Sequence, residues 1–181
     1  MRASQRMPMP DPAVPTARLF VAVWPDALAR AQLGACRDRW RWFVGAKPVD
    51  DAKLHLTLHF IGAFARDRID ALTTALAALP SEHFDLRTGG SELWRGGVAV
   101  LRIDSDRRLM ALHAAIATVL ERFEVILEAR PFLPHVTFAR KARQAEPPST
   151  RCDLAWRANG FALVESTGGT YRVLRVFSSP A

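Results

Sequence analysis

Cysteine is scarce in this chain of 181 residues, which contains only Cys36 and Cys152. The two lie in unlike contexts and form no C-x-x-C pair, so the sequence predicts neither a disulfide framework nor a zinc site. We expect both side chains to be reduced thiols. Glycine-rich phosphate loops are also missing, because the glycine pairs at 89–90, 96–97 and 168–169 have the spacing of turns.

Long apolar runs are missing as well. No stretch approaches the roughly 20 apolar residues that a membrane-spanning helix needs. The start, MRASQRMPMPDPAVPTAR, has charges and four prolines but lacks the apolar core of a signal peptide. We therefore expect a cytoplasmic protein without a membrane partner. Residues 1–16 are expected to be a disordered leader, followed by a single domain over residues 17–181.

Lysine is rare among the basic residues, since 22 of the 25 are arginine. There are 18 acidic residues, and the formal net charge is +7. This excess favours an anionic partner such as nucleic acid or a phosphorylated small molecule. The arginines are scattered along the chain, so a solvated basic surface is the alternative explanation.

Apolar periodicity predicts strands interleaved with helices. The predicted strands cover residues 18–24, 54–62, 98–104 and 134–140, the predicted helices cover residues 26–43, 67–79 and 106–123, and residues 160–167 and 170–177 form a closing hairpin. The polar residues 141–153 are predicted to be a loop. This order favours an α+β fold with mainly antiparallel sheets over a doubly wound parallel sheet.

Two short strings repeat one pattern in the two halves of the chain. KLHLTLHFIG begins at residue 53 and FLPHVTFARK at residue 132, and each places a histidine two residues before a threonine in an apolar strand. In each half the strand follows a helix and an interval. This echo indicates two pseudo-symmetric lobes with flanking helices and an active-site groove between them.

Strand alternation determines which side chains of these strings share a face. In the first string the groove face is predicted to hold His55, Thr57 and His59, and the core face to hold Leu54, Leu56, Leu58 and Phe60. In the second string the groove face holds His135 and Thr137, and the core face holds Val136 and Phe138. Each lobe would then present one imidazole and one hydroxyl to a common groove.

Two imidazoles across a groove suit in-line displacement at phosphorus. One can take a proton from water while the other protonates the departing oxygen, and histidine titrates close to neutral pH. Threonine hydroxyls can donate hydrogen bonds to non-bridging phosphate oxygens. This chemistry requires no metal and no cofactor. The alternative for either string is a half-buried, hydrogen-bonded His-Thr pair with a structural role.

With their flanks, these strings closely resemble the 2H phosphoesterase superfamily, which is named for paired H-x-T-x motifs. Within it the chain resembles the bacterial and archaeal RNA 2',3'-cyclic phosphodiesterases, often labelled 2'-5' RNA ligases. The matching strings are RLFVAVWP, HLTLHFIG, RPFLPHVTFAR and FALVEST with GGTYRVLRVF. They run in the family's order from about residue 17 to residue 178.

The resemblance implies a two-lobed fold and hydrolysis of an RNA 2',3'-cyclic phosphate to a terminal 2'-phosphate. By position, His55 is the proton donor to the leaving 3' oxygen, and His135 is the base that activates water. Thr57 and Thr137 would hold the phosphate, with Arg140 as a charged contact. Strict alternation places Arg140 on the core face, so its reach into the groove requires a twist or the end of the strand.

A further histidine and three aromatic residues are candidates for roles at this site. His59 lies four residues after His55, but the alternating leucines indicate a strand, which disfavours a zinc site of the helical type. Trp94, Phe132 and Tyr171 are candidates for stacking on nucleobases, with packing as the alternative. The string STGGTYR places its arginine after the tyrosine. Some members of the family carry arginines before this tyrosine, and this chain differs from them. The resemblance therefore does not identify the residues that contact the outer part of the RNA.

Three other functions stay open on the sequence. The same groups could ligate RNA ends through a 2'-5' linkage, with a 5'-hydroxyl replacing water. A related activity is hydrolysis of a small cyclic nucleotide. A non-catalytic RNA-binding protein is the third, although intact histidines in both strings speak against it. The expected partners are RNA ends or cyclic nucleotides, and the protein is expected to be a monomer.

Overall fold

The computed structural model describes residues 14–80 and 82–178. Most of the expected leader therefore lies outside the described residues, and the first strand already begins at Thr16, which pairs with Ala65. Across the described ranges, no helix is long and apolar enough to cross a membrane.

The described residues form one mainly antiparallel sheet of nine strands, in the order β7-β4-β5-β6-β3-β1-β8-β9, with β2 added beside β6. The strands are β1 (Thr16–Val23), β2 (Lys47–Pro48), β3 (Leu56–Ala65), β4 (Phe84–Trp94), β5 (Val98–Ile103), β6 (His135–Arg140), β7 (Ala155–Ala158), β8 (Phe161–Thr167) and β9 (Thr170–Phe177). Every pairing is antiparallel. The predicted α+β class is confirmed.

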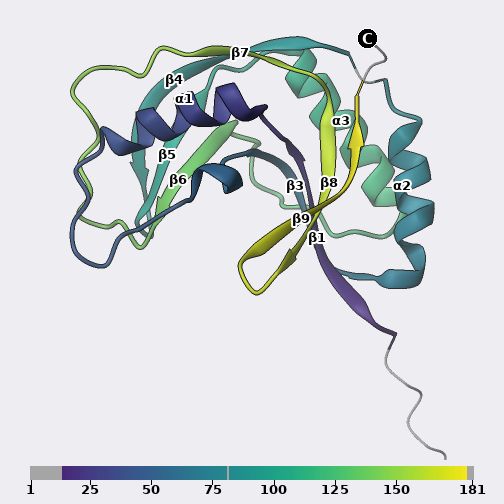
Figure 1. Cartoon of the computed structure of the whole chain (residues 1–181). Coiled ribbons are helices and arrows are strands. Elements are labelled where there is room, and N and C mark those ends of the chain that lie inside the picture. The colour runs from purple at the N-terminus through teal and green to yellow at the C-terminus, as the bar shows by residue number, and fades with distance from the viewer. Residues whose placement is uncertain (1–13, 81, 179–181) are drawn as a thin grey trace, which may run out of the picture.

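The sheet divides into two lobes that meet between β3 and β6. One lobe contains β1, β3, β8 and β9, and the other contains β4, β5, β6 and β7. A single registered residue pair, Leu56 with Val136, joins β3 to β6. The sheet curves strongly, with β7 arching over one end and the β8–β9 hairpin at the other (Figure 1). The curved sheet therefore carries one H-x-T string on each side of its central seam.

Three α-helices pack on the sheet: α1 (Ala27–Asp38), α2 (Ile69–Ala77) and α3 (Arg107–Arg122). Although α1 follows β1, it lies on the side of β4, β5 and β6, whereas α3 follows β5 and packs beside α2 on the other lobe (Figure 1). The helix α1 therefore covers the lobe of β4 to β7, although it follows β1 of the other lobe. The helix α3 covers the lobe of β1 and β3, although it follows β5.

Local signals explain where α1 and α3 begin. The Asp26 carboxylate accepts a hydrogen bond from the amide of Ala29 at 2.8 Å, and Asp106 accepts from the amides of Arg108 and Leu109. Such side-chain caps satisfy amides that have no partner inside the helix. The buried face of α3 carries Leu109, Leu112, Ile116, Val119 and Leu120, which is the helical spacing that the sequence shows.

The helix predicted over residues 26–43 ends at Asp38, five residues early. Trp40 is buried, and the backbone of Arg41 exchanges two hydrogen bonds with Glu146, at 3.0 and 3.1 Å. These contacts with a segment more than 100 residues away require an extended chain. Tertiary pairing therefore overrides a helical pattern that the local sequence would allow to continue.

Three strands, the two-residue β2 and the strands β4 and β7, lie outside the predicted ranges, whereas the closing hairpin is confirmed. The sequence of β4, FDLRTGGSELW, contains two glycines and alternates only partly, and β7 has four residues. In the hairpin, Gly168 and Gly169 have φ values of 57° and 83°. A two-residue turn with positive φ at both positions matches the twist of the flanking strands, and glycine adopts it without strain.

The expectation of two separate reduced thiols is wrong for this structure. Cys36 of α1 and Cys152, which precedes β7, form a disulfide with their Cα atoms 5.8 Å apart. Both side chains are buried. The pair spans 116 residues of sequence, and no local pattern reports such a contact. Because β7 pairs with β4, the disulfide ties α1 to the outer strands of the lobe that it covers.

Candidate active site

The seam between the lobes places the two H-x-T strings side by side, as predicted. Leu56 pairs with Val136, and both side chains are fully buried. Neighbouring residues in a strand face the opposite way, and cross-strand neighbours have Cβ atoms about 5 Å apart. His55 therefore lies across from Thr137, and Thr57 lies across from His135, on the face opposite the core.

The two imidazoles are oriented in the same way. Nδ1 of His55 lies 2.6 Å from the Lys53 carbonyl oxygen, and Nδ1 of His135 lies 2.7 Å from the Leu133 carbonyl oxygen. A carbonyl oxygen can only accept, so we assign the proton of each neutral ring to Nδ1, which leaves Nε2 as an acceptor. In His55, Nε2 is 3.0 Å from the Thr57 hydroxyl, which donates to it.

Aromatic rings surround His55. Trp24 stacks on the imidazole with ring centres 5.3 Å apart and planes 13° apart. Phe20 lies 5.0 Å away, and Tyr171 meets the imidazole edge-on at 5.4 Å. Phe20 belongs to a small apolar cluster with Ala22 and strand β8, on the groove side of the sheet. Sequence analysis missed Phe20 and Trp24, because their string RLFVAVWP signals only a buried strand.

His135 has a corresponding aromatic neighbour in Trp94. The two rings lie 4.4 Å apart, and the indole Nε1 donates to the carboxylate of Glu92 at 2.6 Å. Arg102 lies near both of these residues, 3.6 Å from the Glu92 carboxylate and with its guanidinium 5.8 Å from the Trp94 ring. Each catalytic candidate thus packs against a tryptophan from its own lobe. The predicted stacking of nucleobases on Trp94 and Tyr171 stays a prediction.

Burial lowers the pKa of both histidines. The pKa of His55 falls from 6.5 to about 4, chiefly because burial disfavours the charged ring, and the positive charge of Arg140 and the neighbouring His135 add to this. The pKa of His135 is also lowered, first by burial and then by Arg102 and Arg140. The carbonyl hydrogen bond of each ring opposes the shift. Both rings are therefore neutral at pH 7 in the empty site.

A β-bulge in β3 overturns two predicted positions. His59 pairs with Val21 and Thr57 with Ala22, so Leu58 is an extra residue that reverses the alternation beyond it. His59 therefore turns away from the groove, is 8% exposed, and its ring Nε2–H donates to the His113 carbonyl oxygen at 2.9 Å. Phe60, predicted to face the core, is 50% exposed.

A matching bulge in β6 brings Arg140 to the site. Ala139 pairs with Ala99 and Thr137 with Val100, so Phe138 is the extra residue. Phe138 and Ala139 are both buried, and the next residue, Arg140, is exposed. Its charge acts on both histidines. The bulge thus removes the conflict between strict alternation and a role for Arg140 in the groove.

A hollow of about 470 Å³ extends from His135 toward α3, and its lining includes Thr57, Phe60, Trp94, Phe132 and His135. At its edge the rings of His59, His113 and Phe132 form a continuous stack, with centres 3.9 and 4.0 Å apart. The described parts of the chain contain no group of three His, Cys, Asp or Glu side chains that could hold a metal ion. Nothing in this hollow therefore suggests a metal site.

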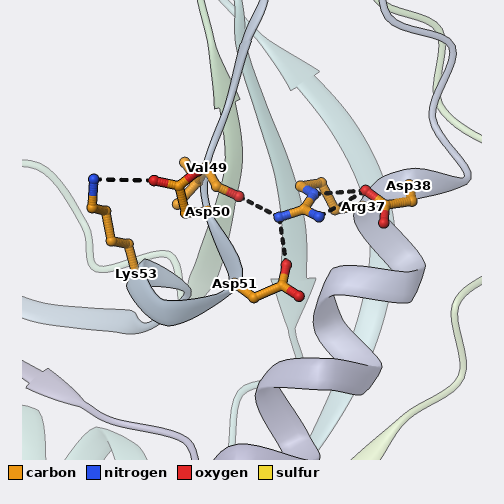
Figure 2. Close-up of polar contacts among 6 residues, drawn as sticks. All are labelled: Arg37, Asp38, Val49, Asp50, Asp51 and Lys53. Atoms are coloured by element: carbon orange, nitrogen blue, oxygen red, sulfur yellow. Dashed lines mark hydrogen bonds and ion pairs between the residues drawn. The ribbon is translucent and has the colours of Figure 1, made fainter.

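The segment before His55 is held by Arg37, at the end of α1 (Figure 2). The Arg37 guanidinium donates to the Val49 carbonyl and lies 2.7 Å from the Asp51 carboxylate. Asp51 begins the 3-10 turn η1 (Asp51–Lys53), whose last carbonyl accepts from the imidazole. Sequence analysis missed this contact between distant segments, for which the sequence has no short-range signal.

Comparisons with known proteins identify the family of this chain and agree with its fold. A family model described as the 2'-5' RNA ligase superfamily matches residues 24–170. A curated relative named RNA 2',3'-cyclic phosphodiesterase, from Thermus thermophilus, is 34% identical, and the match covers 89% of this chain and 89% of the relative. The solved structure of E. coli LigT complexed with 3'-AMP is 26% identical with a TM-score of 0.78, and the match covers 91% of this chain and 98% of that one.

Two further solved structures are similar over most of their length. E. coli LigT complexed with phosphate has a TM-score of 0.73 at 26% identity, and the match covers 90% of this chain and 97% of that chain. TT0787 of Thermus thermophilus has a TM-score of 0.75 at 28% identity, and the match covers 89% and 97%.

Proposed function

Because this chain belongs to the 2'-5' RNA ligase superfamily, we propose that it hydrolyses the 2',3'-cyclic phosphate at the end of an RNA strand and leaves a terminal 2'-phosphate. The observation that carries the proposal is the antiparallel pairing of Leu56 with Val136, which sets two similarly oriented imidazoles on one face of the sheet. The names of the Thermus relative and of the LigT complex with 3'-AMP support it.

The reaction divides the two proton transfers between the lobes. Nε2 of His135 accepts a proton from water, and the water oxygen forms a new bond to phosphorus. The bond between phosphorus and the 3' oxygen breaks, and the imidazolium of His55 protonates that oxygen. The products are a 2'-phosphate and a 3'-hydroxyl, and the proton gained by His135 returns through solvent to His55 for the next turnover.

This division requires His55 to be protonated, although its pKa in the empty site is about 4. A bound cyclic phosphate carries a negative charge, and an anion beside an imidazole raises its pKa. The substrate would therefore bring His55 into its acid form as it binds. His135 has to stay neutral, and burial, followed by the charges of Arg102 and Arg140, keeps its pKa low.

Thr57, Thr137 and Arg140 would hold the phosphate. In the empty site the Thr57 hydroxyl donates to His55, and protonation of that ring releases the hydroxyl for a phosphate oxygen. Thr137 lies in the equivalent position on the other strand. The guanidinium of Arg140 would neutralise charge that builds on the non-bridging oxygens as the water attacks. These groups complete the acid, the base and the phosphate contacts without a metal or a cofactor.

Ligation of RNA ends is the second candidate, since the matching family model is described by that activity. The same groups would catalyse it if the 5'-hydroxyl of a second strand attacked the cyclic phosphate in place of water. The 5' oxygen would then form a bond to phosphorus, the bond between phosphorus and the 3' oxygen would break, and His55 would protonate the 3' oxygen. Because hydrolysis and ligation would use the same acid and the same base, the residues do not distinguish these two reactions. The measured product does.

The test is incubation of RNA ending in a 2',3'-cyclic phosphate with the purified protein, followed by phosphorus NMR of the new terminus. We expect a 2'-phosphate from the wild type and a loss of about 10²–10⁴ in rate from His55→Ala and from His135→Ala. His83→Ala is the matched control, because its imidazole contacts Asn159 outside the groove. A 3'-phosphate product, or unchanged rates in both groove variants, would contradict the proposal.

A further inference from the structure

A second hollow, of about 490 Å³, lies beyond the end of β6, and we refer to it as the outer pocket. Its lining is Phe43, Val44, Ala46, Gly96, Lys141, Ala142, Arg143, Gln144 and Ala145. None of these residues belongs to the acid, the base or the phosphate contacts described above. The apolar part comes from the loop after α1, and the charged part comes from the loop after β6.

Contacts between three loops form the outer pocket before any ligand is present. The backbones of Arg41 and Glu146 exchange two hydrogen bonds, and the amide of Ala142 donates to the Gly97 carbonyl at 2.8 Å. Gly97 has a φ of 77°, and a Cβ there would lie 2.7 Å from the side chain of Arg143. The turn between β4 and β5 thus packs closely against the segment that carries the cations.

The charges of the outer pocket have no acidic partner. Over residues 14–80 and 82–178, Lys141 and Arg143 form no ion pair with a carboxylate, and neither does Arg140. By contrast, Arg66 and Arg172 at the other lobe share the carboxylate of Glu165. Unpaired cations that converge on one hollow favour an anionic ligand.

The apolar part of the pocket is exposed to an unusual degree. Val44 is 108% exposed and lies at the tip of its loop, beside the half-buried ring of Phe43. The loop is anchored by Trp40, which is buried and stacks on Trp42 with ring centres 5.3 Å apart. An aromatic and aliphatic tip next to cations suits a base and its phosphate together.

The outer pocket is continuous with the phosphate site along β6. His135 and Thr137 begin that strand, Arg140 ends it, and Lys141 follows directly. At a rise of about 3.3 Å per residue, Lys141 lies about 13 Å beyond Thr137. β2 runs beside this part of the chain, and its Lys47 pairs with Arg140 and adds a further cation to the track.

Building on the proposed function, in which the substrate is the end of an RNA strand, we infer that the outer pocket binds a nucleotide upstream of the cyclic phosphate. Lys141 and Arg143 contact its phosphate, and Phe43 with Val44 contacts its base. The contacts are to the backbone and to the face of a base, so binding is tolerant of sequence.

The test compares kcat/KM for a nucleoside 2',3'-cyclic monophosphate with kcat/KM for oligoribonucleotides of two to six residues that end in the same group. The wild type should prefer the longer substrates by tenfold or more. In the double variant Lys141→Gln, Arg143→Gln this ratio should fall at least tenfold. Arg107→Gln, Arg175→Gln is the matched control, because it removes the same charge from α3 and β9 and should keep the wild-type ratio.

Binding is measured separately, by fluorescence anisotropy of a labelled hexaribonucleotide that ends in a 2'-phosphate. Because the variant no longer neutralises this one phosphate, the slope of log K against log salt should fall by about 0.7. Equal rates for all substrate lengths in the wild type, or equal losses in the variant and the control, would overturn the inference. If no cyclic phosphate of any length is hydrolysed, the proposed function fails instead, and the anisotropy still reports on the outer pocket.

Discussion

Replacement of His55 by asparagine should make the protein less sensitive to acid. The folded protein holds this imidazole neutral, because burial, Arg140 and His135 lower its pKa from 6.5 to about 4. The unfolded chain, by contrast, takes up the proton near pH 6.5. As the pH falls from 6.5 to 4 the unfolded state therefore binds more protons, so the folded state loses stability over this window.

The size of the effect follows from the shift. One pKa unit corresponds to about 1.4 kcal/mol, so a lowering from 6.5 to about 4 makes His55 responsible for about 3 kcal/mol of the stability lost between pH 7 and pH 4. His55→Asn removes the titrating ring, and the amide can still donate to the Lys53 carbonyl. The variant also lacks the ring that stacks on Trp24, and this loss changes its stability at every pH. The informative quantity is therefore the change in the free energy of unfolding between pH 7 and pH 4.

The assay is urea unfolding followed by circular dichroism, at intervals from pH 7 to pH 4. The free energy of unfolding should fall by about 3 kcal/mol less in His55→Asn than in the wild type. His113, whose pKa is also lowered to about 4, titrates in both proteins and cancels in the comparison. An equal loss in the two proteins would refute the burial argument for His55.

Three other outcomes are expected. Turnover should survive EDTA, and a loss restored by one divalent metal would contradict the proposed acid–base mechanism. Arg140→Gln should raise the pKa of His55 in an NMR titration of the free protein, because it removes a positive charge near the ring. Cys36→Ser should lower the free energy of unfolding by about 5 kcal/mol, since the disulfide closes a loop of 116 residues. Urea melts of that variant and of the oxidised wild type check this value, and identical melts of these two would contradict it. Wild type treated with dithiothreitol should melt like the variant.

The two H-x-T strands were predictable because each alternates apolar and polar residues over several positions. Leu54, Leu56 and Val136 are buried as alternation requires. Alternation also places Leu58 and Phe138 in the core, where both are buried, but it does not predict that each is the extra residue of a bulge. A bulge depends on the register with a partner strand, and the sequence of the bulged strand alone does not determine that register.

Contacts between distant segments account for the remaining differences. Trp40 leaves the predicted helix because its loop pairs with residue 146, and Cys36 meets Cys152 because α1 lies over the far lobe. The environment of His55 depends in the same way on Phe20 and Trp24 near the start of the chain and on Tyr171 near its end. A local pattern shows that such residues are apolar, and the fold decides what they touch.

The exchange of α1 and α3 between the lobes means that no single cut divides this protein into two self-sufficient pieces. A fragment ending before β4 would contain β1 and β3 together with a helix whose contact surface belongs to the missing half (Figure 1). The other fragment would lack the strands on which α3 packs. Each piece alone would expose apolar surface and an unpaired sheet edge, whereas the two together would reconstitute the seam and, with it, both imidazoles. Although the molecule looks duplicated, each lobe depends on a helix from the other half of the chain. We therefore expect two fragments to complement each other when mixed, and neither half to fold alone.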